Sequence, residues 1–200
     1  FGHPRHGRTV KFAGRLASRG GAVSPAPFVL HTSTPPLPAA LRAGTRDLHD
    51  RTEAAFVLGA PTVTRAVYAA VLGRLAAFYG RTEAALAPWA PALAPLGLDL
   101  AARRKAPLLH RDLDALGAVP PNPDAGSAPV IASLPVALGT LYVLEGATLG
   151  GQLLRRRLGP ALGLTPDAGL AFFSAYGADV GPMWRAFTAA LDRFDHATPA

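Results

Sequence analysis

Four side chains near residue 49 have the chemistry to bind an anionic metal complex. His49 offers an imidazole nitrogen, and Arg42 and Arg46 precede it by about 10 Å and about 4.5 Å along a helix axis. An imidazole can ligate iron, and guanidinium groups bind carboxylates through paired hydrogen bonds. The set therefore suits a flat metallocycle that carries acidic side groups. Glu53, four residues after His49, is expected either to orient the other ring nitrogen or to pair with a nearby base.

A second unusual stretch spans residues 138–152, where four glycines interrupt an apolar helical pattern. Gly139, Gly146 and Gly150 fall within about 40° of one another on a helical wheel. Each interior glycine destabilises a helix by about 1 kcal/mol relative to alanine. Such a stripe suggests that something must approach the backbone closely. The pattern itself leaves two occupants open, a flat ligand or another helix.

Each feature also has an ordinary interpretation. A histidine beside an apolar stripe is commonly a boundary residue, and the pair Gly146 and Gly150 is commonly a helix–helix contact. Their joint presence in a small chain without cysteine favours a flat cofactor held between two helices. The lack of cysteine excludes disulfides and thiolate ligands, and it suits a reducing, cytoplasmic location.

The elements that must position these residues are predicted to be helices. Apolar residues recur with helical spacing, alternating β-branched runs are scarce, and prolines fall between the periodic segments. On the first helix, Leu41, Leu48, Thr52 and Phe56 form the stripe that we expect to be buried. No uncharged apolar run reaches 18 residues, so no membrane span is expected. The sequence predicts an all-α domain with helices at 38–57, 64–86, 98–116, 133–158, 166–176 and 180–194.

The net charge of +7 is concentrated at the N-terminal end. Residues 1–37 carry five basic and no acidic side chains, while the other residues carry 15 basic and 13 acidic ones. This segment is rich in Gly, Pro and Ser and lacks periodicity, so we expect residues 1–37 to be a disordered basic tail before a domain at 38–200. No aromatic or fold motif accompanies the charges, so nucleic acid is not an expected partner.

Two stretches together resemble one known family. Residues 41–53 (LRAGTRDLHDRTE) are similar to the proximal-helix motif of heme oxygenases, and residues 141–152 (LYVLEGATLGGQ) are similar to their distal-helix motif. The two motifs occur in the same order as in that family, and the resemblance extends over residues 37–194. The sequences of both motifs are most similar to those of the bacterial type that is associated with bacteriophytochromes.

The resemblance implies a single-domain helical bundle with heme between the proximal and distal helices. His49 would be the iron ligand, and Gly146, Gly150 and Gly151 would form the catalytic face of the distal helix. Heme would be both substrate and prosthetic group, opened to biliverdin, CO and ferrous iron with O₂ and external electrons. A ferredoxin or a reductase would donate them, since the chain shows no flavin or nicotinamide fingerprint.

The remaining cofactor-binding residues follow from the same resemblance. Arg42 and Arg46 would lie near the heme carboxylates, together with Arg185. Tyr142 is expected either to reach a carboxylate through its hydroxyl or to pack at a seam between helices. Residues 155–157, three consecutive arginines, would either favour the negative end of the helix dipole or form a docking face for an acidic donor.

The chain also departs from the family pattern. Ala147 stands where animal relatives carry an aspartate that orders water for oxygen activation, and Glu145 lies about 100° around the helix from Gly146, so it is no simple replacement. Thr188 and Ala189 stand where a second basic residue is expected. The chain ends at Ala200, where relatives continue with another helix, so this cover is expected to be absent or the sequence truncated.

Two rival functions therefore stay open beside the enzyme. One is a protein that binds or carries heme without turnover, which loss of the distal acid would permit. The other is a helical interaction module without a cofactor, whose glycines serve helix contact and whose tail binds a polyanion. The regiochemistry of ring opening and the oligomeric state do not follow from the sequence.

Overall fold

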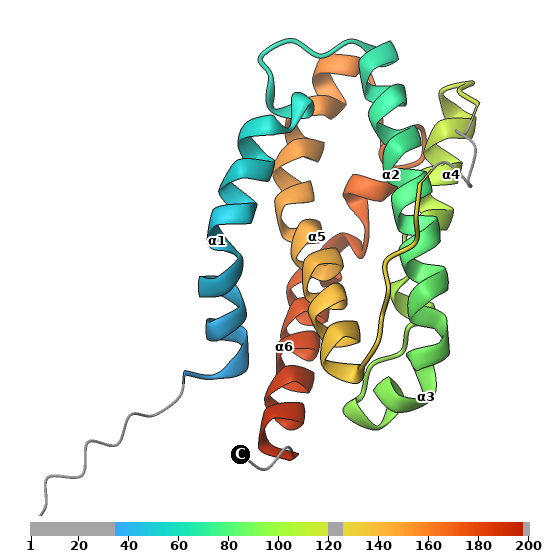
Figure 1. Cartoon of the computed structure of the whole chain (residues 1–200). Helices are drawn as coiled ribbons and strands as arrows, with labels where there is room; N and C mark the ends of the chain where they lie inside the picture. The colour runs from blue at the N-terminus through green and yellow to red at the C-terminus, as the bar shows by residue number, and fades with distance from the viewer. Residues whose placement is uncertain (1–34, 120–125, 198–200) are drawn as a thin grey trace, which may run out of the picture. The chain divides into compact units, whose positions relative to one another are not determined.

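The computed structural model describes residues 35–119 and 126–197, and every regular element in these residues is helical (Figure 1). The predicted all-α fold is confirmed. The predicted tail lies outside the described residues except for its last three positions. The α-helices are α1 (Leu37–Ala55), α2 (Arg65–Leu86), α3 (Ala90–Leu93), α4 (Ala106–Ala115), α5 (Leu134–Leu162) and α6 (Val180–Ala197).

The core lies where α2 packs against α4 and where α5 packs against α6. Two of these helices begin at a side-chain cap: Thr64 accepts a hydrogen bond from the backbone of α2, and Ser133 does so for α5. The apolar stripes that they orient meet in one cluster. Its fully buried members include Tyr68, Leu72, Leu93, Leu109, Leu113, Leu138, Leu158, Phe187 and Leu191.

Helix α1 is attached differently, because none of its residues is buried. It packs against α6, and Leu41 contacts the core only in part. Leu48 and Thr52, predicted to continue the buried stripe, are exposed, with 62% of Leu48 accessible. That part of the prediction was wrong because no described helix covers this half of α1. Phe56, just after the helix, rejoins the core.

Two predicted helices differ from the structure: one is shorter than expected, and the other does not form. The segment 98–116 forms a 3₁₀ turn at Ala101–Arg103, and its α-helix begins only at Ala106. The segment 166–176 is no α-helix, and its regular part is the 3₁₀ turn Phe172–Ser174. Gly169 and Tyr176 adopt left-handed backbone conformations, φ +92° and +65°, which a right-handed helix cannot contain.

Helix α5 is longer than predicted, because it continues through Pro160 to Leu162. A proline removes one helical hydrogen bond and need not end a helix that packing holds in place. Gly163 ends the helix instead, in the left-handed conformation at φ +62°. By length and composition α5 is the one described helix that is apolar enough to cross a membrane. Its buried Glu145 and its packing against α6 are those of a core helix.

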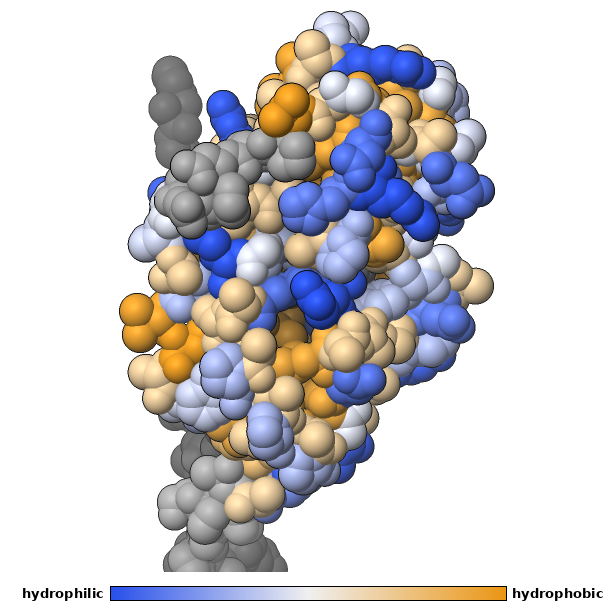
Figure 2. Space-filling view, turned by 90° about the vertical axis from the view of Figure 1, so that its right-hand side faces the viewer, coloured by the Kyte–Doolittle hydropathy of each residue, from blue (hydrophilic) through white to orange (hydrophobic). Residues whose placement is uncertain are grey.

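The shorter elements connect these helices. They are 3₁₀ turns at Val57–Gly59, Ala87–Trp89, Ala94–Leu96 and Gly177–Asp179. The side of the molecule that carries α2 and α4 mixes hydrophilic and hydrophobic side chains, and a shallow hollow near the centre of the view has apolar side chains at its floor (Figure 2). Residues 120–125, between α4 and α5, lie outside the described residues.

Candidate functional site

Helices α1 and α5 bring the two predicted motifs to the same level of the bundle. Both helices pack against α6, and both begin at the same end of the bundle and run in the same direction (Figure 1). His49 and Gly146 each follow the first residue of their helix by twelve positions. At 1.5 Å per residue, each lies about 18 Å from the start of its helix. The imidazole and the glycine stripe are therefore at matching heights.

The glycine stripe of α5 is uncovered. A Cβ atom added to Gly139 or Gly150 would meet nothing within 4 Å, and one added to Gly146 would meet only the Trp184 ring, at 3.9 Å. In the described residues the stripe is therefore not a close helix–helix contact, which was one of its two interpretations. Gly151 is different, because it is buried and its Cβ would lie 3.5 Å from the Phe173 ring. The structure thus places Gly151 in the core, not on the stripe.

Large apolar side chains flank the stripe and are exposed. Val143, Leu149 and Leu153 of α5 are 56%, 42% and 72% accessible. Together with Gly139, Gly146 and Gly150 they form what we call the open face of α5. Apolar area gathered on one helix face is normally covered by a partner or a ligand. A largely apolar plate would cover it, and Leu48 of α1 offers further uncovered apolar area.

An apolar hollow adjoins the N-terminal half of the open face. It has a volume of about 400 Å³ and lies between α2 and α5. Its walls include Phe78 and Thr82 of α2 and Val136, Gly139 and Val143 of α5. The hollow extends the uncovered surface toward α2, so the apolar area next to the glycines is larger than the stripe alone.

His49 is exposed and lies between two carboxylates of its own helix. Its Nδ1 is 3.7 Å from Asp50 Oδ1, and its Nε2 is 3.6 Å from Glu53 Oε1. Two thirds of its side chain is accessible. Glu53 thus contacts the ring, as one of its predicted roles requires. Arg42 and Arg46 are exposed on the same helix. The imidazole is therefore accessible to a ligand, which would take the place of the carboxylate beside one of its nitrogens.

Two further predicted residues are Tyr142 on α5, beside the open face, and Arg185 on α6. The Tyr142 ring packs against the Trp184 ring with centroids 5.6 Å apart, which is the packing interpretation of this tyrosine. Arg185 is exposed on α6, the helix that contacts both α1 and α5. Its Nη1 atom lies beside Gly181, one turn earlier.

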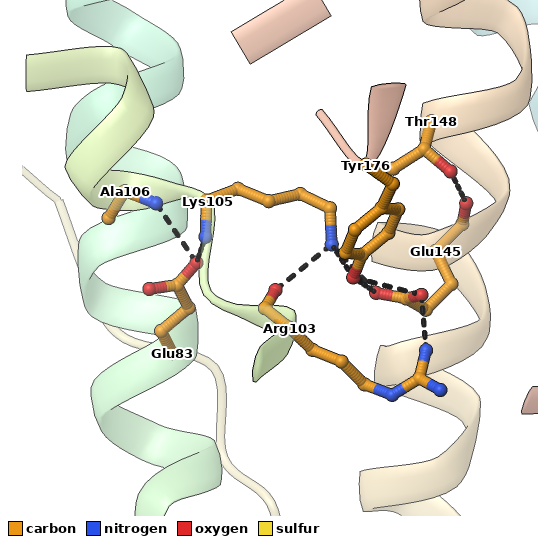
Figure 3. A network of polar contacts seen from close by, with 7 residues as sticks. All are labelled: Glu83, Arg103, Lys105, Ala106, Glu145, Thr148 and Tyr176. Atoms are coloured by element: carbon orange, nitrogen blue, oxygen red, sulfur yellow. Dashed lines mark hydrogen bonds and ion pairs between the residues drawn. The ribbon is translucent and has the colours of Figure 1, made fainter. Parts of the chain in front are cut away.

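Behind the open face, Glu145 is the centre of a buried ionic cluster (Figure 3). Only 1% of its surface is accessible. Arg103 Nη1 donates to Oε2 at 2.5 Å, and Lys105 Nζ donates to Oε1 at 2.7 Å. The Tyr176 hydroxyl lies 2.9 Å and 3.2 Å from the two oxygens and 3.0 Å from Lys105 Nζ. Glu145 is paired and faces away from the open face, so this geometry agrees with the expectation that it is no simple replacement for a distal acid.

Comparison with known proteins identifies the family. The sequence model of the family described as Heme oxygenase matches residues 36–199. The chain is 34% identical over 140 residues to a protein named Heme oxygenase from Xanthomonas campestris pv. campestris (strain 8004), covering 68% of this chain and 78% of that protein. This chain belongs to the heme oxygenase family. No solved structure matches it.

Family membership makes this protein an enzyme that degrades heme, as the two sequence motifs indicated. Heme is its substrate and ligand, and the family uses an electron donor. The interpretation of this chain as a helical module without a cofactor is therefore wrong. The all-α structure is consistent with the fold of this family.

Sequence reasoning missed the partners of Glu145 in this heme oxygenase. Arg103, Lys105 and Tyr176 come from segments predicted as helices, and nothing in their spacing links them to α5. One signal was available: Glu145 lies within an apolar stretch, about 100° from Gly146 and toward the buried side of the wheel. A buried carboxylate needs cations or donors, so the sequence predicts that partners exist but not which ones.

One of the consecutive arginines at 155–157 makes a contact that neither interpretation included. The helix extends beyond them to Leu162, so its last turn contains no basic residue and the dipole interpretation is wrong. Arg157 Nη1 instead donates to the carbonyl oxygen of Gly59 at 2.8 Å. This bond ties α5 to the segment that follows α1, so it connects the two helices that carry the heme oxygenase motifs.

Three of the four tyrosines of this heme oxygenase are expected to resist alkaline titration. Burial raises the pKa of Tyr68, Tyr79 and Tyr176 far above the ordinary value of 10.0, and nearby carboxylates raise it further. A phenol with a higher pKa in the folded state keeps its proton there while the unfolded chain loses it, so stability falls as the pH rises above 10. Absorbance of tyrosinate should therefore rise for these three only as helical circular dichroism is lost. Their titration in a still folded protein would contradict the burial.

Proposed function

We propose that this enzyme opens heme to biliverdin, with release of CO and ferrous iron, and that His49 is the proximal iron ligand. One observation carries the proposal: an exposed imidazole on α1 stands at the same level as an open, side-chain-free stretch of α5. A single protein ligand suits an iron that already has four ring nitrogens around it. Bound heme supplies the iron that activates O₂ and the ring that is oxidised.

The residues of this chain would hold that substrate from two sides. His49 would bind from α1 through one ring nitrogen, while the carboxylate beside the other nitrogen, that of Glu53 or of Asp50, would orient the ring. Arg42 and Arg46 would neutralise the heme carboxylates, and Arg185 of α6 is proposed to assist them. Such charge-assisted pairs fix orientation as well as add affinity. Tyr142, held against Trp184, limits how far the ring can slide along α5.

On the other side of the heme, the open face of α5 would allow the ring to approach the helix backbone closely and would exclude water. Gly146 and Gly150 have no side chain, so the ring can approach the helix backbone more closely than any larger residue would permit. Val143, Leu149 and Leu153 cover the ring edges with apolar surface, which removes water from the reacting centre. The enzyme thereby restricts where oxygen can be directed, while the chemistry itself belongs to the cofactor.

Proton supply in this enzyme is proposed to rely on water. Ala147 is exposed beside the open face, and its methyl side chain has no proton to donate. Glu145 is buried, and both of its oxygens accept hydrogen bonds from cationic groups. Of the described residues on α5 from 145 to 151, Thr148 carries the only hydroxyl, and it donates to the carbonyl oxygen of Glu145 at 2.6 Å. Solvent at the mouth of the site is therefore the source that we propose.

The partners that we propose are O₂ and a separate donor such as a ferredoxin or a reductase. The distal motif further supports assignment to the type associated with bacteriophytochromes, and hence a pathway link to such a photoreceptor. We propose a cytoplasmic location, because the chain has no cysteine and the reaction needs a reduced donor.

A heme titration followed by single-turnover reduction tests the proposed function. Added hemin should give a Soret band that saturates at one heme per chain. Reductant and O₂ should then replace that band with the spectrum of a bilin, whose identity as biliverdin is checked by chromatography. A Soret band that persists under reductant and O₂ would favour a protein that carries heme without turnover. The lack of a proton donor at position 147, where alanine stands, supports that alternative.

A further inference from the structure

The glycines of the open face cannot fix the rotation of their own helix. A Cβ on Gly139 or Gly150 would touch nothing within 4 Å, and one on Gly146 would meet only the Trp184 ring, at 3.9 Å, so these glycines make no tight or directional contact that resists a turn of α5 about its axis. The Cα atoms lie about 2.3 Å from the axis, so a rotation of about 10° moves them by about 0.4 Å. The rotation must therefore be set from the opposite side of the helix.

The opposite side holds directional contacts at the level of Gly146. Glu145, its neighbour in sequence, is fixed by Arg103 and Lys105 through both carboxylate oxygens, and Lys105 Nζ also donates to the Arg103 carbonyl oxygen at 3.0 Å. Replacement of a buried ionic cluster by apolar side chains is often neutral or stabilising, so such a cluster is weak evidence for stability. Its directional bonds specify one arrangement of the groups that they join.

The cations are themselves held in place from α2. The carboxylate of Glu83 accepts hydrogen bonds from the backbone N–H groups of Lys105 and Ala106, at 2.6 Å and 3.1 Å. Figure 3 shows the Lys105 side chain extending from this anchored segment toward Tyr176 and Glu145. Rotation of α5 would therefore have to break bonds to a segment that α2 keeps in position.

Tyr176 adds backbone strain to the cluster. It is the one non-glycine residue among those described that has a positive φ, +65°. A left-handed backbone is unfavourable for a residue with a Cβ, and it persists only where surrounding contacts enforce it. Here the enforced backbone brings the hydroxyl to Glu145 and places the ring 4.7 Å from Lys105 Nζ. Strain of this kind is typical of groups that position a functional site.

We propose that Glu145, held by Arg103, Lys105 and Tyr176, is a positioning residue that sets the rotation of α5 and thereby the distance of the Gly146 and Gly150 backbone from bound heme. The proposal rests on the proposed function, because it takes the open face as one wall of the heme site. It assigns no proton transfer to the cluster and no contact between Glu145 and heme.

The test compares two tyrosine variants that each lose one buried hydroxyl. Tyr176→Phe removes the hydroxyl on Glu145, whereas Tyr68→Phe removes one that donates to the Gly169 carbonyl oxygen at 2.7 Å, away from the cluster. In ¹⁵N-labelled, heme-free protein, Tyr176→Phe should move the amide signals of Gly146 and Gly150 by more than their linewidths. Tyr68→Phe should leave both signals in place.

The carboxylate variant Glu145→Gln is expected to act in the same direction and more strongly. It should move the same signals and lower heme affinity by roughly tenfold, because a rotated α5 backbone no longer fits the ring and misfits of this kind cost about 1–3 kcal/mol. Unchanged glycine signals in a folded Tyr176→Phe protein would overturn the proposal, even if Glu145→Gln failed to fold. The amide comparison needs no heme, so a wild-type protein that failed to convert heme would sink the proposed function and leave this test intact.

Discussion

Replacing His49 with alanine is expected to abolish the proximal iron bond and to reduce heme conversion by roughly 100-fold or more. His49 makes no contact with the core, and two thirds of its side chain is exposed, so the fold should not depend on it. The Soret band of the hemin complex should therefore shift or weaken while the melting temperature stays within error. Both quantities are measured on the same sample, by absorbance and by circular dichroism.

His110→Ala is the matched control for that variant. His110 is another exposed histidine on a helix, α4, which packs against α2 and lies away from both motifs. The control should retain the wild-type Soret band and the wild-type rate. Addition of free imidazole to His49→Ala should restore part of the Soret band, since the ligand and not the helix is missing. An unchanged spectrum in His49→Ala would remove this histidine as the ligand.

Helices whose limits depend on apolar periodicity and caps could be predicted from the sequence. Segments whose backbone conformation depends on tertiary contacts could not. The spans of α1, α2 and α6 follow from apolar spacing with prolines between them. The segment 166–176 has helical composition, yet the left-handed backbone at Gly169 and Tyr176 prevents a helix. Such conformations are chosen by contacts far away in sequence, here the hydrogen bonds that Tyr176 makes with Glu145 and Lys105.

The candidate site shows the same division between local and distant causes. His49 and the glycine stripe were found because each is odd within its own helix: an imidazole beside an apolar stripe, and glycines inside a helix that they destabilise. The prediction that Leu48 is buried failed for a related reason. A stripe on a wheel shows that a surface needs cover, but it cannot say whether a helix or a ligand provides that cover.

The exposed Leu48 and the open face of α5 are therefore two parts of one observation. Both are apolar, both lie on the motif-bearing helices, and in the described residues neither is covered by another helix. The buried cluster around Glu145 is the opposite case, because here charged groups are covered. Removing three charged groups from water is unfavourable, and only well-oriented ion pairs and hydrogen bonds offset that penalty. The fold thus leaves apolar area open on one side of α5 and buries charge on the other.

Substitution of Gly150 by alanine is expected to stabilise the protein and weaken its function together. The added Cβ would meet nothing within 4 Å, so the heme-free protein has room for it. Removing an interior helical glycine should raise the free energy of unfolding by about 0.5–1 kcal/mol. If heme covers this face, the same methyl group meets the ring, and overpacking of about 1–3 kcal/mol lowers heme affinity or turnover by about 5- to 150-fold. Gly150→Leu should give a larger loss of function with little change in stability.

Gly80→Ala provides the comparison that separates the two effects. Gly80 is also interior to a helix, α2, and an added Cβ there would likewise meet nothing within 4 Å. It should give the same gain in stability without loss of heme conversion, because Gly80 is not on the open face. Urea unfolding followed by hemin titration measures both quantities for each variant. Full activity in Gly150→Leu would show that nothing approaches the α5 backbone during the reaction, since a side chain of that size cannot share the space with a bound ring.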